Sequence, residues 1–178
     1  MRRKLIYLHL VLAGVMAPAF LLLAVSGGLY LVGIKGSTAD TAVALPADAV
    51  LDFDSPDLDA RVRALLQRGG IEHDFEYIRN RGSRIELRPT SRTYLSLAQT
   101  PDGLRAMRHD PDLQKSLIEL HKGHGPQLFK LYQKIVALVL LGVVFGGVAV
   151  GLMSRVYRRP TQISLLVGTA VFAALAML

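Results

Sequence analysis

The sequence predicts a membrane protein with three transmembrane helices and one small α+β domain outside the bilayer. All fourteen acidic residues lie between Asp40 and Glu119, and long runs without any charge stand on both sides of that block. A charge at the centre of a bilayer costs about 2.5–3.5 kcal/mol on insertion scales. An uncharged apolar run of about 18 or more residues is therefore typical of a membrane span.

The first uncharged run extends from residue 5 to residue 34. We assign residues 1–34 to a cytoplasmic N-terminus and transmembrane helix 1. The apolar stretch is about twice as long as that of a cleaved signal peptide, so we expect this helix to be retained. Pro18 lies in its middle, removes one backbone hydrogen bond and predicts a kink.

Residues 35–126 form the predicted domain outside the bilayer, which begins with a helix. Asp54-Ser55-Pro56 combines a capping residue with a proline, as is typical of a first helical turn. An apolar stripe follows at helical spacing, and Gly69-Gly70 predicts its end. The stripe consists of Leu58, Val62, Leu65 and Leu66.

Alternation of apolar and polar residues next predicts an antiparallel meander. Asp110-Pro111 then predicts the start of a helix that returns to the membrane. A unit of about seventy residues has only a thin core, so we expect it to pack on the bilayer surface or on a partner. The expected strands cover residues 72–77, 84–88, 93–98 and 104–107, with a turn at 100–103.

Transmembrane helix 2 is predicted at residues 127–154, a cytoplasmic loop at 155–160 and transmembrane helix 3 at 161–178. Helix 2 carries two glycine pairs at i, i+4 spacing, which allow helix backbones to approach closely in a bilayer. We expect one glycine face to meet helix 1 or helix 3 and a second to meet a partner. The pairs are Gly142 with Gly146 and Gly147 with Gly151, and the expected contacts are Gly14, Ala17, Ser26 and Gly27 in helix 1 or Gly168 in helix 3.

The net charge of +7 belongs almost entirely to the short segments beside the predicted helices. Short flanks rich in Lys and Arg stay in the cytoplasm. We therefore expect the N-terminus inside, and the 35–126 domain and the C-terminus outside, facing the periplasm of a bacterium. The rest of the chain has a net charge close to zero, which argues against a nucleic-acid partner. The flanking cations are Arg2, Arg3, Lys4, Arg155, Arg158 and Arg159.

Three short motifs stand near the ends of the predicted helices. They are Tyr7-Leu8-His9, Ser26-Gly27-Gly28-Leu29-Tyr30 and Leu117-Ile118-Glu119-Leu120-His121-Lys122-Gly123. With them, most of residues 3–153 resembles the PepSY-associated transmembrane proteins. The resemblance implies a protein of the bacterial inner membrane whose α+β domain is PepSY-like and periplasmic. Larger relatives include ferric-siderophore reductases, which carry haem b between helices on histidine ligands.

The resemblance makes His9, His121 and His124 candidate ligands of haem b. A bis-histidine haem needs two imidazoles on opposite faces of one porphyrin, usually from different helices. His9 and His121 are expected at opposite ends of the membrane, and His121 and His124, if helical, share one face. One chain thus offers no complete site, and haem would need a dimer or a partner subunit. The alternative is that these histidines make hydrogen bonds at the membrane surface, without haem or a metal ion.

The chain lacks the motifs of common enzyme classes, so we predict no catalytic residue and no metal site. It has no cysteine, no glycine-rich phosphate loop, no His-Glu-Xaa-Xaa-His and no Gly-Xaa-Ser-Xaa-Gly. Ser26 lies in helix 1 with no expected base nearby. We expect His73 and His109 to face solvent or to make local hydrogen bonds.

Arg84 and Arg88 share one face of a predicted strand, with Glu86 between them. This face is either solvated and balanced by nearby acids, or a basic contact with anionic headgroups or an acidic partner.

These features favour an accessory subunit without enzymatic activity. Its outer domain and glycine-rich helix 2 are expected to dock on another membrane protein or on a second copy of the chain. The alternative is a haem b-binding electron-transfer protein with haem at a dimer or partner interface. A third hypothesis, a PepSY domain that restrains a periplasmic peptidase, depends on the resemblance alone.

Overall fold

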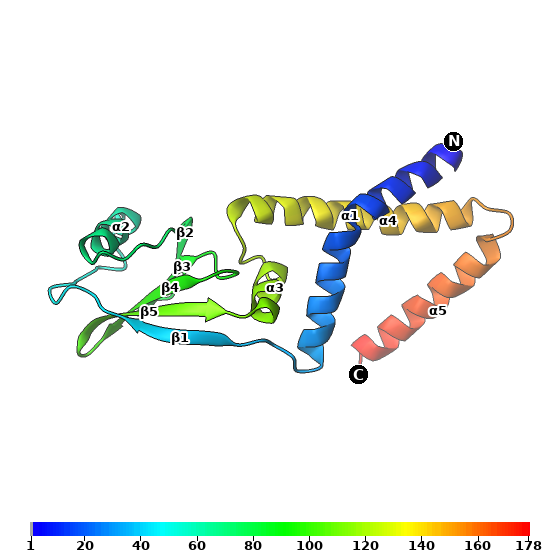
Figure 1. The fold of residues 1–178 in the computed structure, drawn as a ribbon. Coiled ribbons are helices and arrows are strands. Elements are labelled where there is room, and N and C mark those ends of the chain that lie inside the picture. The colour runs from blue at the N-terminus through cyan, green and yellow to red at the C-terminus, as the bar shows by residue number, and fades with distance from the viewer. Residues whose placement is uncertain (1) are drawn as a thin grey trace. The chain divides into compact units, whose positions relative to one another are not determined.

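A computed structural model describes residues 2–178 of the chain (Figure 1). The chain divides into two compact units. The helical unit consists of the chain up to Leu21 together with Lys134–Leu178, and the sheet unit consists of Leu22–Gln133. The elements in chain order are α1 (Arg2–Leu31), β1 (Thr38–Val43), α2 (Leu58–Arg68), β2 (Tyr77–Asn80), β3 (Arg84–Arg88), β4 (Tyr94–Thr100), β5 (Gly103–Pro111), α3 (Leu113–His121), α4 (Gln127–Leu152) and α5 (Arg158–Ala176).

Three of these helices are long and apolar enough to cross a membrane. Their highest mean hydropathies over 18 residues are 2.3 in α1, 2.8 in α4 and 1.2 in α5. The shortest, α5, has 19 residues, and at about 1.5 Å per residue its length is close to a hydrocarbon core of about 30 Å. These helices agree with the predicted membrane location, and α1 continues through Pro18.

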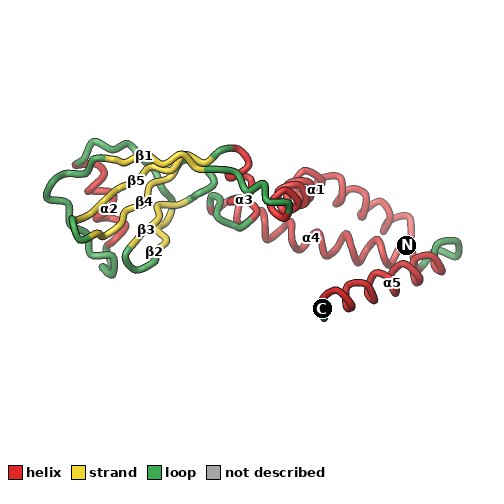
Figure 2. Tube along the Cα trace, turned by 90° about the horizontal axis from the view of Figure 1, so that it is seen from below, coloured by secondary structure: helices red, strands yellow, loops and turns green. Residues whose placement is uncertain are grey.

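The five strands form one antiparallel sheet in the order β1-β5-β4-β3-β2 (Figure 2). The β2–β5 part is the predicted meander. Together with the helices, the sheet makes the described part of the chain an α+β mixed fold, as predicted. Strand β1 was not predicted. Its short polar sequence has no apolar alternation, and it becomes a strand by pairing with β5, from Thr38 opposite Pro111 to Val43 opposite Ala106.

Several boundaries differ from the predictions, among them those of α4, which ends at Leu152, and α5, which runs from Arg158 to Ala176. Residues 72–76, expected in a strand, lie outside β2, which begins at Tyr77. Pro111 ends β5 and does not start a helix; the cap of α3 is Asp112, whose side chain accepts a 2.7 Å hydrogen bond from Lys115 N–H. The helix expected from Asp54 begins at Leu58. Pairing with β1 lengthens β5 beyond the predicted 104–107, because a partner strand stabilises residues that have little strand tendency of their own.

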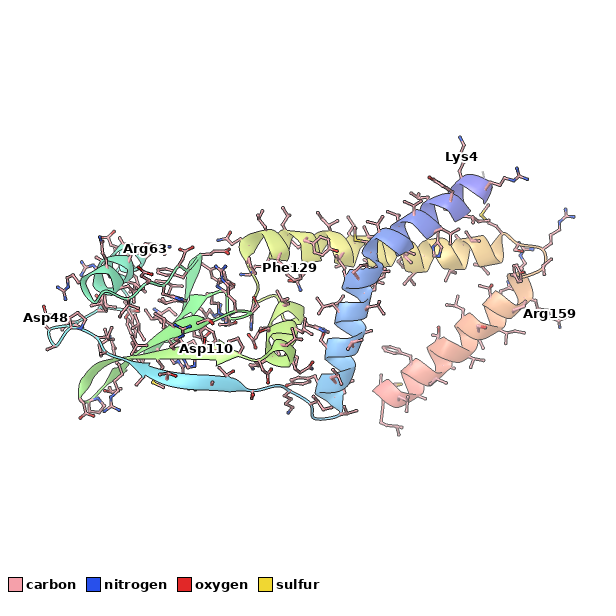
Figure 3. The ribbon with its side chains drawn as sticks, viewed as in Figure 1. Lys4, Asp48, Arg63, Asp110, Phe129 and Arg159 are labelled. Atoms are coloured by element: carbon pink, nitrogen blue, oxygen red, sulfur yellow. The ribbon has the colours of Figure 1, made fainter. Side chains whose placement is uncertain are left out.

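One face of the sheet packs on α2 and forms the core. Arg63, labelled on α2 in Figure 3, covers the ring of Phe75 with its Cζ atom 4.0 Å from the ring centroid. Successive side chains in a strand point to opposite sides of the sheet. The polar residues that alternate with the core residues therefore lie on the opposite face. The core consists of Leu51, Phe53, Val62, Leu65, Leu66, Phe75, Ile85, Leu87, Leu95, Leu97 and Ala106.

Candidate functional sites

In the helical unit, the glycines of α4 pack against His9 of α1. A Cβ atom added at Gly147 would lie 3.3 Å from His9 Cε1, and one added at Gly146 would lie 3.7 Å from His9 Nδ1. His9 Nδ1 is buried and has no hydrogen-bond partner among the described residues. Helix α4 therefore contacts α1 through one glycine of each pair, Gly146 and Gly147, and the α1 residue there is His9; Gly14 has nothing within 4 Å.

The remaining glycine positions of this unit divide into packed and open ones. A Cβ atom at Gly151 would collide with Thr161 Oγ1, so α4 and α5 approach closely there. Gly142 and Gly168 have only open space beside them. The glycine faces of α4 are thus used in part by α1 and α5.

A groove of about 810 Å³ lies between the end of α4 and one side of α5. Leu152 of α4 lines it, and the α5 residues follow at intervals of three and four, which puts them on a single helical face. Helix α5 has no buried residue. The α5 lining consists of Gln162, Leu165, Leu166, Thr169, Ala170 and Ala173.

In the sheet unit, His121 at the end of α3 contacts Ser26 of α1. Ser26 Oγ lies 2.5 Å from the Leu22 carbonyl oxygen and 2.8 Å from His121 Nδ1. A hydroxyl has one proton, and the carbonyl can only accept, so Ser26 donates to Leu22 and His121 Nδ1–H donates to Ser26. The prediction that Ser26 has no base nearby was wrong. Ser26 is nevertheless no nucleophile, because its proton goes to a carbonyl and the nitrogen beside it is a donor.

His124 belongs to a second cluster. Its Nδ1 lies 2.7 Å from Glu119 Oε2, which also accepts a 2.7 Å hydrogen bond from Thr90 Oγ1–H. Helix α3 ends at His121, and the chain reverses at Gly123, which has φ +75°. His121 and His124 therefore do not share a helical face, contrary to the sequence-based expectation.

The electrostatics of Glu119 indicate a structural role. Burial by itself would raise the pKa of this carboxyl group. The hydrogen bonds from Thr90 and His124, with the charges of His124 and Lys115, outweigh burial, so the pKa of Glu119 is lowered from its usual 4.5. The ionised carboxylate thus holds the segment after β3 to the linker that leads into α4.

Arg84 and Arg88 differ in what they offer to a partner. Arg88 is 5% exposed and forms a 2.7 Å ion pair with Glu86. Burial would raise the pKa of Glu86, but Arg88 and Arg81 outweigh it and lower that pKa from 4.5. Arg88 is therefore a neutralised buried cation and offers no contact surface, whereas Arg84 is exposed. Of the predicted basic face, only Arg84 is accessible.

Three strands bring together Asp40, His109 and Ser96 on the polar face of the sheet. Asp40 Oδ1 lies 2.6 Å from His109 Nδ1, and Ser96 Oγ lies 2.8 Å from His109 Nε2. The Arg84 Nη2 atom lies 3.1 Å from the same Nε2. Since a guanidinium only donates, Nε2 accepts, and Nδ1–H donates to Asp40. His109 is 5% exposed and so does not face solvent.

This order of groups matches that of a serine hydrolase triad, but the surroundings do not. Ser96 is 2% exposed, so a substrate cannot reach its hydroxyl group in the folded chain. Arg84 shares the nitrogen that would take the serine proton. The cluster therefore acts as a hydrogen-bonded tie between β1 and the centre of the sheet.

We expect Ser96 to be inert toward a fluorophosphonate probe in the folded protein, because a reagent cannot reach a buried hydroxyl. Ser96→Ala should lower the free energy of unfolding by about 1 kcal/mol, the typical loss for one hydrogen bond. Mass spectrometry of the labelled chain is the measurement, with Ser83→Ala in an exposed turn as control. Labelling that disappears in Ser96→Ala but persists in Ser83→Ala would contradict this role.

His73 is half-buried and fits neither of the two expectations, solvent exposure or a local hydrogen bond. Its Nε2 is buried without a hydrogen-bond partner in the part of the chain described. Burial, followed by the charges of Arg92 and Arg108, lowers the pKa of His73 from 6.5, so the ring is kept neutral.

The donor atoms do not complete a haem or metal site within either unit. No cluster of three or more His, Asp or Glu side chains suited to a metal ion occurs among residues 2–178. His121 is the sole imidazole that lines the groove beside Ser26. A bis-histidine haem there needs a ligand from another chain.

Comparison with protein-family models, with curated proteins and with solved structures found no match. Membership of the PepSY-associated family thus remains a prediction. Sequence reasoning missed the Asp40–His109–Ser96 cluster, because these residues are far apart in the chain and no local pattern connects them. The Ser26–His121 contact was missed for the same reason, although both residues lie in the motifs that carried the resemblance.

Proposed function

We propose that this protein is an accessory subunit of the bacterial inner membrane that docks on a transmembrane helix of another membrane protein. The observation that supports this role is the groove between α4 and α5. It is apolar and open, and most of its lining lies on one face of α5, a helix that has no buried residue.

The composition of that face favours a helix as the occupant. Ala170 and Ala173 allow a second helix backbone to approach closely, which is how helices associate in lipid. Gln162 makes no hydrogen bond to the described residues, whereas Thr169 Oγ1–H donates to the Leu165 carbonyl 2.8 Å away. An amide in or near hydrocarbon needs a partner, and a neighbouring helix supplies one that lipid tails cannot.

The sheet unit fits the same role as a PepSY-like domain on the periplasmic side. Its polar clusters are satisfied by hydrogen bonds among their own residues, and no group of three or more His, Asp or Glu suited to a metal ion occurs among the described residues. The domain is therefore suited to contact and not to catalysis.

Site-specific crosslinking tests the docking groove. The chain has no cysteine, so Ala170→Cys carries the only thiol and can be labelled with a benzophenone maleimide in native membranes. Val171→Cys is the matched control, because residue 171 lies about 100° around the helix from residue 170 and outside the groove lining. We expect irradiation to give one discrete protein adduct from position 170 and none from position 171.

A blocking substitution completes the test. Ala173→Trp fills the groove and should abolish the adduct formed from Ala170→Cys. Adducts with lipid alone, or equal adducts from both positions, would refute the docking groove. An adduct of twice the chain mass would identify a second copy as the occupant and would refute the accessory-subunit role.

Haem b binding is the second candidate, and His121 is the observation that favours it. Because Nδ1–H donates to Ser26, Nε2 carries the lone pair that an iron ligand needs, and it has no hydrogen bond to the described residues. A visible-absorption spectrum of the purified protein separates the two functions. A Soret band that His121→Ala removes would support haem, whereas its absence under adequate haem supply would exclude it.

A further inference from the structure

A small apolar groove in the sheet unit lies between the end of α1 and the end of α3. Its volume is about 310 Å³. Gly27 and Leu31 of α1 and Ile118 of α3 supply most of its apolar lining, and Tyr30 and Lys122 stand beside them. This groove is separate from the α4–α5 groove of the helical unit.

Two cations lie near the ring of Tyr30: Lys122, which lines the groove, and Lys35, which lies outside its lining. Lys35 Nζ lies 5.1 Å from the centroid of Tyr30, and Lys122 Nζ lies 5.2 Å from it. Among the described residues, neither ammonium group forms an ion pair with a carboxylate. Both charges make the electrostatic potential beside Tyr30 positive, so an anion bound next to this ring would be favoured.

The two segments that form the groove are held together, because hydrogen bonds join both ends of α3 to α1 or to the chain that follows α1. At one end His121 contacts Ser26. At the other, Ser37 N–H and Oγ–H donate to Asp112 Oδ2 over 2.7 and 2.8 Å. Gly36 has φ +68°, and a Cβ atom there would collide with Lys115 N. The close approach therefore requires glycine at that position.

The position along the chain places this groove at a membrane surface. The uncharged run that contains α1 ends at Ile34, and Lys35 is the first charge after it. Tyrosine and lysine at such a boundary are typical of the headgroup level of a bilayer. A ligand bound here meets hydrocarbon on one side and water on the other.

We propose that this groove binds one anionic phospholipid, with an acyl chain along Gly27, Leu31 and Ile118 and the phosphate beside Tyr30, within reach of Lys122 and Lys35. The apolar lining and the paired ammonium groups match the two ends of such a lipid. A lysine near a lipid surface contributes enough to change affinity about fivefold. Preference for phosphatidylglycerol over phosphatidylcholine follows, because phosphatidylcholine has no net charge.

Native mass spectrometry of the full chain in a neutral detergent tests the proposal. Titration with phosphatidylglycerol should fill one site at lower concentration than titration with phosphatidylcholine. Lys35→Gln and Lys122→Gln should each reduce that preference about fivefold, and the double variant about twenty-five-fold. Lys130→Gln is the matched control, because Lys130 also lies over a tyrosine ring, 3.6 Å from the Tyr77 centroid, but neither lines this groove nor lies near Tyr30.

Three outcomes would overturn the proposal. The first is equal affinity for both lipids. The second is a loss of lipid preference in Lys130→Gln as large as that in Lys35→Gln or Lys122→Gln. The third is displacement of the lipid by excess inorganic phosphate. The last would identify a site for free phosphate without a role for the apolar lining. The crosslink in the α4–α5 groove should persist in Lys35→Gln and Lys122→Gln, so the two proposals fail independently.

Discussion

Phe75→Ala should lower the free energy of unfolding of the sheet unit by about 3–5 kcal/mol. Phe75 is 2% exposed, so truncation leaves a cavity between α2 and the sheet. The substitution also removes the ring that Arg63 covers, a contact of about 1 kcal/mol or more. Because a small domain has few kcal/mol in total, we expect local unfolding to become frequent.

Hydrogen exchange of β3, β4 and β5 peptides in the full chain measures this effect, since amides of the core exchange through the opening of the whole unit. Phe75→Leu is the control, because it keeps most of the apolar volume and should cost less than about 1.5 kcal/mol. Equal protection in Phe75→Ala and the wild type would show that the α2 layer contributes little to the core.

Glu119→Gln should destabilise the sheet unit by about 1–3 kcal/mol at neutral pH. The side chain of Glu119 is 10% exposed and accepts from Thr90 and His124. Glutamine keeps the shape but loses the charge, and one of its two terminal atoms cannot accept. Thr90→Val tests the same cluster from the other side and should cost about 1 kcal/mol.

The same carboxyl group makes stability depend on pH. The folded pKa of Glu119 is lowered from 4.5, so the unfolded chain takes up the proton first as the pH falls. The stabilisation is complete above about pH 4.5 and is lost as the pH falls through the folded pKa. Glu86 behaves in the same way, because its pKa is lowered by Arg88 against the effect of burial.

Exchange protection measured between pH 3 and pH 7 checks this dependence. We expect the loss in acid to be shallower in Glu119→Gln than in the wild type, with the contribution of Glu86 remaining. The same dependence of exchange protection on pH in the two proteins would show that Glu119 does not contribute to the loss of stability in acid.

Phe75 shows what the sequence pattern can and cannot predict. Alternation over residues 72–77 indicated that one side of this segment is buried, and Phe75 is buried. The same alternation predicted a strand, whereas residues 72–76 lie outside β2. Hydrophobic pattern reports which side chains leave water, but the backbone conformation there depends on which neighbouring strand is available for pairing.

His121 and His124 show a similar limit at the candidate sites. The motif around them was noticed in the sequence, and their spacing suggested one helical face. A turn at Gly123 separates them, so one contacts Ser26 and the other Glu119. Their partners lie 95 and 5 residues away in the chain, and spacing alone indicates neither.

The sequence by itself determined the three apolar helices, the sheet domain between the first two, the β2–β5 meander and the glycine positions of α4. Charge and hydropathy are local properties, and solvation acts on each segment separately, so these features follow from the order of residues. Only the tertiary structure decided the pairing of β1 with β5, the Asp40–His109–Ser96 tie and the positions of Lys35 and Lys122 near Tyr30. These contacts join segments far apart in the chain, and their geometry depends on how the whole sheet and its helices pack.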